Sequence, residues 1–334
     1  KRNQIIIITL LIVTAITARI IPGARTIDDA FITFRYARNI LAGNGFVFNP
    51  GEFVLGTTTP LYTLLMAGIG FFWGNTPIPF PQISLFVNAI ADSLTCMLIY
   101  FIGKRLGSSL GGISAGFAWA VAPFSVTFAI GGLETSVYIL LLTCAIWFHL
   151  TRFRKAAAFF AVLSIITRPD AIILIGPIVL DRIYQSRFEN DKIRLIETCC
   201  SLLPGILWGA FARCYFGSFI PHSVQAKLEV YRLDVYSSFI RILQHYALLF
   251  MQNKVINNAI AIGIGLVIVP FFYLSGAVRS FILNRSILPF ALYPLLYLIA
   301  FSLPNPLIFR WYLAPPTPVL LLFVLIGADS FLLK

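Results

Sequence analysis

Residues 26–46 read TIDDAFITFRYARNILAGNGF, and they directly follow the first long apolar run of the chain, residues 5–22. Apolar side chains recur every three to four residues in this stretch, which predicts a helix with one apolar face over roughly residues 28–42. The turn Gly43-Asn44-Gly45 is expected to end that helix. A helix of this kind beside an apolar run is expected to lie on a membrane surface.

The composition of the whole chain predicts a membrane protein. Of its 334 residues, 59% are hydrophobic and only 11% are charged, which is more apolar surface than one soluble core of this length can bury. The net charge of +12 comes from basic residues in short, separate loops. We therefore expect these residues to orient the chain in the membrane, and we expect no nucleic-acid partner. The five cysteines fall in or beside apolar runs without metal-type spacing and are interpreted as buried apolar side chains.

Apolar runs long enough to cross a bilayer predict an all-α polytopic membrane protein with about ten transmembrane helices, within a range of about nine to eleven. The expected spans cover roughly residues 5–22, 82–103, 108–130, 133–150, 156–167, 170–180, 195–215, 257–275, 287–303 and 312–331. A further run near residues 58–73 is short and lies between Thr-rich and Pro-rich segments, so a juxtamembrane helix is expected there.

One transmembrane domain is expected over residues 1–334, with a first outer loop at 23–81 and a second large outer loop at 216–256. Residues 1–22 are interpreted as a retained signal-anchor, because no convincing small-residue cleavage site precedes Asp28. Ten spans place both termini on one side of the membrane. The loops on that side are short and almost wholly basic, which predicts that it is cytoplasmic. The loops on the other side mix both charges with Trp, Tyr, Asn and His, which predicts a functional site on the outer face of the plasma membrane.

Asp28 and Asp29 open the predicted helix of the first outer loop. One interpretation is that they only cap this helix and favour its dipole. One carboxylate suffices for capping, however, which leaves the second unexplained. A helix N-terminus keeps carboxylates ionised, and ionised carboxylates suit a general base or a cation ligand.

Two further outer segments carry charges at helix ends. Glu134, in the motif GGLET, is either a site residue or a water-exposed neighbour of a helix cap. Arg168 and Asp170, in the motif TRPD, lie at a proline break between two short spans, where non-helical backbone is tolerated if protein or a cavity covers it. These two residues form either part of a site or a structural ion pair.

The last two candidate segments are polar loops of the outer face. His222 and Lys227, in FGSFIPHSVQAK, either bind a substrate or are ordinary solvated loop residues, and a lone histidine of this kind predicts no metal site. Arg310 and Tyr312, in FRWYLAPP, lie at the outer end of the last span. They either anchor the chain at the membrane interface or hold a lipid phosphate, to which a guanidinium offers a planar fork.

The order of these motifs resembles that of the integral-membrane C-type glycosyltransferases. The motifs are DDAFITFRYARNILAGNGFVFNPGE, TTTPLY, GLET, TRPD, FGSFIPHSVQAK and FRWYLAPPTPVLLL, and they extend over nearly the whole chain. The resemblance is strongest to the bacterial branch related to mycobacterial arabinofuranosyltransferases, and protein O-mannosyltransferases are more distant relatives. It implies a lipid-linked sugar donor and an acidic pair at a juxtamembrane helix. By this resemblance Asp28 is the expected catalytic base, Asp29 its partner or a cation ligand, and Arg310 a phosphate contact.

These expectations describe an inverting glycosyltransferase that moves a sugar from a polyprenyl phosphate to a hydroxyl of a glycan, lipid or protein acceptor. Asp28 would take the acceptor proton, and cations would stabilise the departing phosphate. The acidic pair allows a divalent ion such as Mg²⁺ or Mn²⁺ but does not require one. Membrane lipids are the other expected partners. The rival interpretation is a transporter or flippase, whose signature would be polar residues deep in several spans, and Arg19 and Asp92 are the main candidates for it.

Overall fold

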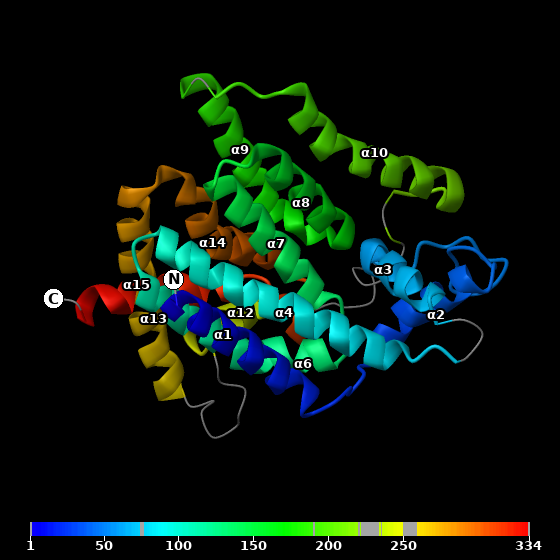
Figure 1. The fold of residues 1–334 in the computed structure, drawn as a ribbon, viewed down its shortest axis with the longest axis horizontal. Helices are drawn as coiled ribbons and strands as arrows, with labels where there is room; N and C mark the ends of the chain where they lie inside the picture. Colours follow the sequence, from blue (N-terminus) through cyan, green and yellow to red (C-terminus); the bar gives the residue numbers. More distant parts are fainter. Residues whose placement is uncertain are drawn as a thin grey trace.

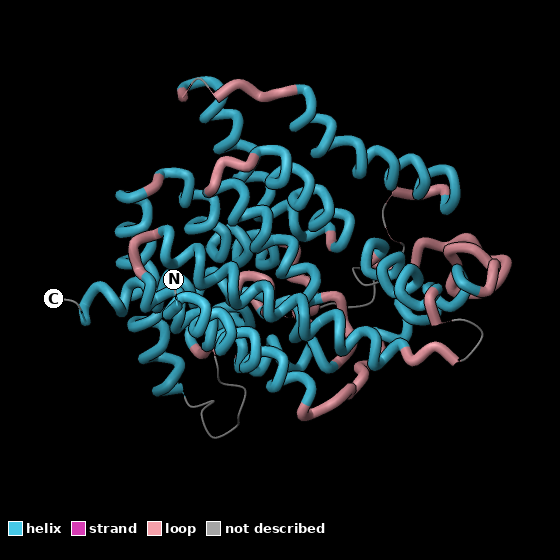
Figure 2. The backbone as a smooth tube through the Cα atoms, viewed as in Figure 1, coloured by secondary structure: helices cyan, strands magenta, loops and turns pink. Residues whose placement is uncertain are grey.

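The computed structural model describes residues 2–73, 77–189, 191–219, 221, 234, 236–249 and 259–332. Within these ranges the chain forms α-helices and short 3-10 turns joined by loops, and no β-strand occurs (Figure 2). The long helices pack together as a bundle, and the helices of the first predicted loop lie at one edge of it (Figure 1). The predicted all-α class is confirmed.

In the described part of the chain, six helical segments are long and apolar enough to cross a membrane. They are α1 (Arg2–Ile20), α4 (Phe80–Arg105), α10 (Leu195–Phe216), α13 (Ala259–Leu283), the segment Arg285–Ser302 that contains α14 (Leu288–Ser302), and the segment Arg310–Leu332 that contains α15 (Thr317–Leu332). Each coincides with a predicted span. The chain is therefore a multi-pass membrane protein.

The run predicted as one span over residues 108–130 is instead a bent pair of helices. α5 (Ser109–Val121) and α6 (Pro123–Ile130) meet at an angle of 44° and together form a seventh candidate span. Pro123 explains the bend, because a proline ring disfavours helical geometry at the residue before it. Ala122 accordingly has φ −58° and ψ 130°, which is outside the helical region.

The remaining predicted spans form the shorter helices α7 (Thr135–Leu150), α8 (Arg154–Thr167) and α9 (Ile172–Phe188). The predicted break between α8 and α9 is confirmed. Arg168 is extended, with φ −150° and ψ 129°, and the 3-10 turn η1 (Pro169–Ala171) follows it. Pro169 causes this break, since it lacks an N–H donor and its ring clashes with a preceding helical turn.

Glycines allow two pairs of helices to approach closely. α4 crosses α5 where Gly103 meets Gly112, and α13 crosses α15 where Gly276 meets Gly327. A Cβ atom on Gly276 would overlap the carbonyl oxygen of Phe323. Close contact between small residues is a common way for helices to pack inside a membrane, where burial of apolar surface supplies no driving force.

α10 lies along one side of the bundle and packs on α8, and its C-terminal end meets the loop that follows the first-loop helix α2 (Ala30–Leu41) (Figure 1). There Phe46 packs against Trp208 and Phe216, and the Phe46 backbone N–H donates to the hydroxyl of Tyr215 at 3.1 Å. Much of the rest of α10 is exposed, as expected of a helix that faces lipid.

The five cysteines are free, and their predicted burial is only partly correct. Cys96 is buried in α4, whereas Cys199 and Cys214 are exposed on α10. Cys199 and Cys214 have apolar neighbours in the sequence because α10 is long and apolar enough to span the membrane. α10 lies at the edge of the bundle, so its small apolar side chains can face lipid and not the protein core.

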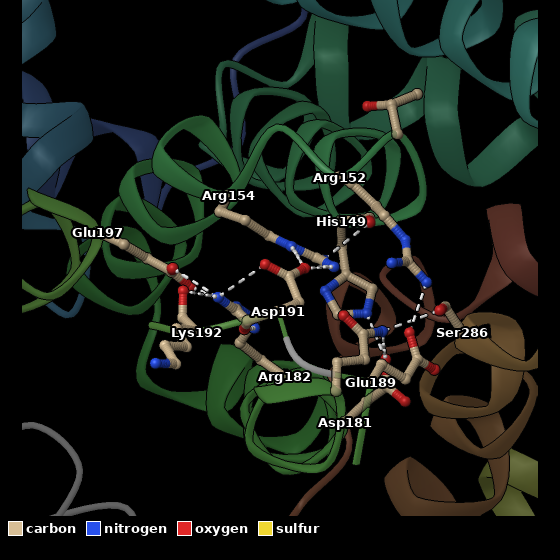
Figure 3. A network of polar contacts seen from close by, with 12 residues as sticks. His149, Arg152, Arg154, Asp181, Arg182, Glu189, Asp191, Lys192, Glu197 and Ser286 are labelled. Carbon is tan, nitrogen blue, oxygen red and sulfur yellow. Dashed lines mark hydrogen bonds and ion pairs between the residues drawn. The ribbon is translucent and has the colours of Figure 1, made fainter. Parts of the chain in front are cut away.

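Near the loops that join α7 to α8 and α9 to α10, away from α2 (Figure 1), three arginines pair with carboxylates (Figure 3). Arg182 donates to Glu197 at 2.6 and 2.9 Å, and Arg154 donates to Asp191 at 3.0 and 2.7 Å. Sequence reasoning attributed these basic residues to membrane orientation alone. It did not predict that Arg182 also joins α9 to α10, or that Arg154 joins α8 to the loop before α10.

Candidate active site

A cavity of about 310 Å³ lies at the end of the bundle where α2 begins. Its walls come from several separate stretches of the chain: Asp29, Ile32, Thr33, Gly56, Thr57, Thr58, Thr59, Leu133, Glu134, Arg168, Pro169, Asp170, Phe301, Trp311 and Tyr312. Five of the predicted site residues are thus brought together here, namely Asp29, Glu134, Arg168, Asp170 and Tyr312. Aromatic walls with a few convergent polar groups are typical of small-molecule sites.

Arg168 is the buried centre of the charge network in this cavity, with 4% of its surface exposed. Its guanidinium donates to Glu134 at 3.1 Å and forms a fork to the two oxygens of Asp170 at 3.0 and 3.1 Å. The ring centroids of Tyr138 and Tyr312 each lie 5.0 Å from its Cζ atom. The Arg168–Asp170 ion pair that was considered as a structural alternative therefore exists, and it also lines the cavity.

Burial and pairing shift the protonation of this network. Burial raises the pKa of Glu134 above its usual range, although the charge of Arg168 acts in the opposite direction. Burial lowers the pKa of Arg168, but Asp170, Glu134 and two nearby tyrosines together raise it by more, so the guanidinium stays charged. The cavity lining holds the carboxyl groups of Asp29, Glu134 and Asp170 with one guanidinium. An anion such as phosphate is therefore expected at the rim of the cavity and not inside it.

The two adjacent aspartates at the start of α2 have different surroundings. Asp28 is exposed and is absent from the cavity lining, and its carboxylate accepts the backbone N–H of Asp29 at 3.0 Å. Asp29 is the N-cap residue of α2, makes no side-chain capping hydrogen bond, and lines the cavity. Of the two aspartates, Asp29 therefore lines the cavity, whereas Asp28, the expected base, makes the local hydrogen bond.

Arg310 is exposed and does not line the cavity, whereas its neighbours Trp311 and Tyr312 do. Next to this segment lies α12 (Ser237–Ala247), whose Ser238 hydroxyl donates to the carbonyl oxygen of Pro306. Partial burial and the nearby charge of Arg310 both lower the pKa of Arg241 on this helix. Sequence reasoning missed Arg241, because its position beside Arg310 depends on how α12 packs.

His222 and Lys227 lie outside the described residues. Within the described part of the chain, no group of three His, Cys, Asp or Glu side chains is placed to hold a metal ion. Glu134 and Asp170 direct their carboxylates to Arg168 instead. These two carboxylates of the described cavity lining are therefore paired with a guanidinium.

Threonine hydroxyls form another part of the cavity lining. Thr33, Thr57 and Thr59 are all buried, and the hydroxyl oxygen of Thr59 lies 3.3 Å from that of Thr33 and 3.2 Å from that of Thr57. The motif TTTPLY contributed to the family resemblance, but no role was expected for its threonines. The available signal was the run of three hydroxyl residues before Pro60 in an outer loop.

The two polar residues expected deep in the spans, Arg19 and Asp92, pair with each other. Both are fully buried, and Arg19 donates to Asp92 at 2.8 Å and to the carbonyl oxygen of Ala120 at 2.8 Å. The hydroxyl of Ser136 also donates to Asp92 at 2.8 Å. These contacts hold α1, α4, α5 and α7 together and leave the pair closed to water, so this pair does not provide the polar path expected of a transporter.

The sequence is similar to that of a mycobacterial glycosyltransferase. No family model matches the chain. The terminal beta-(1->2)-arabinofuranosyltransferase of Mycobacterium tuberculosis (strain ATCC 25618 / H37Rv) is 27% identical over 219 residues, which is 60% of this chain and 34% of that relative. The chain therefore spans about a third of the length of this curated relative.

The fold is similar to that of a solved membrane protein. The crystal structure of ArnT from Cupriavidus metallidurans, bound to undecaprenyl phosphate, matches with a TM-score of 0.69 and 13% sequence identity over 99% of this chain and 60% of ArnT. A match of nearly the whole chain at such low identity shows a shared fold. The chain is therefore a membrane protein of the C-type glycosyltransferase fold, as its motifs predicted.

Proposed function

We propose that this chain transfers a sugar from a polyprenyl-phosphate donor to a hydroxyl of a glycan, lipid or protein acceptor, with inversion at the anomeric carbon. The observation that carries the proposal is the position of Asp29, whose carboxylate is free of a capping bond and lines a cavity at the end of a membrane helix bundle. The fold shared with ArnT, which was crystallised with undecaprenyl phosphate, supports the donor class. The similarity to an arabinofuranosyltransferase makes arabinofuranose the first sugar to test.

In this mechanism Asp29 is the general base. It takes the proton of the acceptor hydroxyl while the hydroxyl oxygen attacks the anomeric carbon of the donor. The new C–O bond forms as the bond between that carbon and the phosphate oxygen breaks, and the bonding electrons leave with the polyprenyl phosphate. Because phosphate departs as an anion, it needs little proton donation.

We propose that the donor phosphate lies at the rim of the cavity, and the charge distribution supports this position. Arg168 is already paired with Glu134 and Asp170, so we assign it to holding these carboxylates in place beside the sugar. Arg310 is exposed next to the cavity lining and is our candidate for the phosphate contact. Tyr312 lines the cavity and is assigned to sugar binding. His222 and Lys227 stay proposed donor contacts outside the described residues.

The basic residues near the loops support a proposal for the orientation of the site. Arg152 and Arg154 lie away from α2 (Figure 1), and the positive-inside bias favours a cytoplasmic location for that end of the bundle. We therefore propose that the cavity opens on the outer face of the plasma membrane and that both termini are cytoplasmic. A polyprenyl-phosphate donor in the outer leaflet would then place its phosphate at the level of the cavity rim.

The base assignment is tested by comparing Asp29→Asn with Asp28→Asn in the purified full chain. The two variants each neutralise one carboxylate of the same turn at nearly constant shape. The assay contains undecaprenyl-phosphate-linked arabinofuranose and an arabinofuranosyl oligosaccharide acceptor in lipid vesicles. We expect Asp29→Asn to lower the transfer rate by about 10²- to 10⁴-fold, the usual contribution of a positioned base. We expect Asp28→Asn to change it by only a few-fold, and a larger loss in Asp28→Asn than in Asp29→Asn would contradict the assignment.

A further inference from the structure

We propose that the hydroxyl groups of Thr33, Thr59 and Thr57, here called the threonine ladder, bind a second hydroxyl of the acceptor, next to the one that attacks the donor. This assignment rests on the proposed function and adds the chemical class of the acceptor, a neutral polyol such as a sugar residue. The position of the ladder, its unused hydrogen-bonding capacity and the charge of the cavity carry the inference.

The threonine ladder lies beside the proposed base. Thr33 follows Asp29 by four residues, and Asp29 already has helical geometry with φ −58° and ψ −27°. The two residues therefore share a helix face, with Cβ atoms about 5–6 Å apart. Both line the cavity, as do Thr57 and Thr59. A group that presents one hydroxyl to Asp29 consequently has its neighbouring atoms beside the ladder.

The ladder has hydrogen-bonding capacity that the described part of the chain does not use. Its three hydroxyls are linked by two contacts, Thr33 to Thr59 at 3.3 Å and Thr57 to Thr59 at 3.2 Å. Each contact uses one donor proton, so one of the three protons has no acceptor among the described residues. Free lone pairs are also left on these oxygens. Buried groups of this kind can donate to and accept from a ligand hydroxyl inside the cavity.

The central hydroxyl of the ladder is not required by the local fold. Thr59 is the N-cap residue of α3 (Pro60–Phe71), but its side chain makes no capping hydrogen bond. Thr63, one turn further along α3, provides a contrast. Its hydroxyl donates to the carbonyl oxygen of Thr59 at 3.1 Å, and it is fully buried outside the cavity lining. The hydroxyl of Thr59 is therefore available to a ligand, whereas that of Thr63 is not.

The surrounding cavity favours a neutral polyol over other hydroxyl acceptors. Carboxyl groups outnumber cations in its lining, which disfavours an acidic acceptor such as a phosphorylated headgroup. An aliphatic alcohol would leave the buried hydroxyls of the ladder unpaired, and a site built to bind hydroxyls rejects such a ligand. A sugar residue offers hydroxyls on adjacent carbons and an apolar face for Trp311 and Tyr312.

A double-mutant cycle between protein and acceptor tests this assignment. Thr59→Val removes the central hydroxyl at nearly constant shape, Thr59→Ser restores it, and Thr63→Val is the matched control. The acceptors are an arabinofuranosyl oligosaccharide and the analogues that each lack one hydroxyl beside the accepting one. Each variant is assayed as the full chain in vesicles that contain undecaprenyl-phosphate-linked arabinofuranose.

We expect the wild type to lose about 3- to 10-fold in kcat/KM on one deoxy analogue, which corresponds to one neutral hydrogen bond. The kcat/KM of Thr59→Val on the parent acceptor should be lower than that of the wild type by a similar factor. On the deoxy analogue, Thr59→Val should show no further decrease in kcat/KM, and its KM for the donor should be unchanged. Thr59→Ser and Thr63→Val should behave as the wild type. The ladder assignment would be overturned if the effects of Thr59→Val and of the missing acceptor hydroxyl on kcat/KM were additive, or if Thr63→Val lowered kcat/KM as much as Thr59→Val. Either result would leave the proposed transfer activity unaffected. A wild type that forms no glycosidic bond with any acceptor would overturn both proposals.

Discussion

Glu134 is 8% exposed and shares the guanidinium of Arg168 with Asp170. Burial raises its pKa above the usual range despite the nearby cation. Such a carboxyl group binds its proton more tightly in the folded protein than in the unfolded chain. The protonated Glu134 therefore adds its full contribution to the free energy of unfolding at a pH below the pKa that this group has in the unfolded chain. That contribution is lost as the pH rises through the higher pKa of Glu134 in the folded protein.

Glu134→Gln should remove this part of the pH dependence, because the amide does not titrate. Relative to the variant, the wild type should have its greatest advantage below a pH of about 4.3, the ordinary pKa of glutamate. That advantage should shrink as the pH rises through the raised folded-state pKa. Thermal unfolding of both proteins in detergent from acidic to neutral pH measures the difference. An advantage that grows with pH would show that pairing with Arg168 outweighs burial.

At the scale of residues, the sequence singled out Asp29, Glu134, Arg168 and Asp170, which line the cavity, but it did not predict how neighbouring side chains point. Asp28 and Asp29 are chemically identical neighbours, and a rotation of about 100° per residue around a helix separates them. The structure places only Asp29 in the cavity lining. The contact between Thr33 and Thr59 was also beyond prediction, because it joins two elements whose packing leaves no local pattern in the sequence.

At the scale of elements, the apolar runs predicted the helices closely, because a membrane requires nearly continuous apolar segments of defined length. The break at Pro169 was predicted from the clash of its ring with a helix. The bend at Pro123 has the same cause and was missed, because the apolar run continues without interruption through it. Composition alone therefore predicted where helices occur but not where one span divides in two.

The crossing of α13 and α15 leads to a prediction about stability. Gly276 faces the backbone of α15, where a Cβ atom would overlap the carbonyl oxygen of Phe323, whereas Gly263 on the same helix has open space around it. Gly276→Ala should lower the free energy of unfolding by about 1–3 kcal/mol, the usual cost of overpacking. Gly263→Ala should be neutral or stabilise the protein by up to about 1 kcal/mol through helix propensity. Equal unfolding temperatures for the two variants in detergent would argue against this close crossing.

At the scale of the whole molecule, the two ends of the bundle have different chemistry. The end near α2 holds the cavity, with Asp29 and the buried network around Arg168. The other end holds ion pairs such as Arg182 with Glu197, which joins α9 to α10 (Figure 3). Charge patterning along the sequence predicted this separation. It did not predict the ion pairs, because their partners come together only when the loops of neighbouring helices meet.

The most direct test of the proposed function is the configuration of the bond that the protein makes. The purified full chain in lipid vesicles is given undecaprenyl-phosphate-linked arabinofuranose and an arabinofuranosyl oligosaccharide, and the product is examined by NMR. We expect a new glycosidic bond whose anomeric configuration is opposite to that of the donor, formed in step with release of undecaprenyl phosphate. Movement of the donor across the bilayer with no new glycosidic bond would contradict the proposal and indicate a transporter.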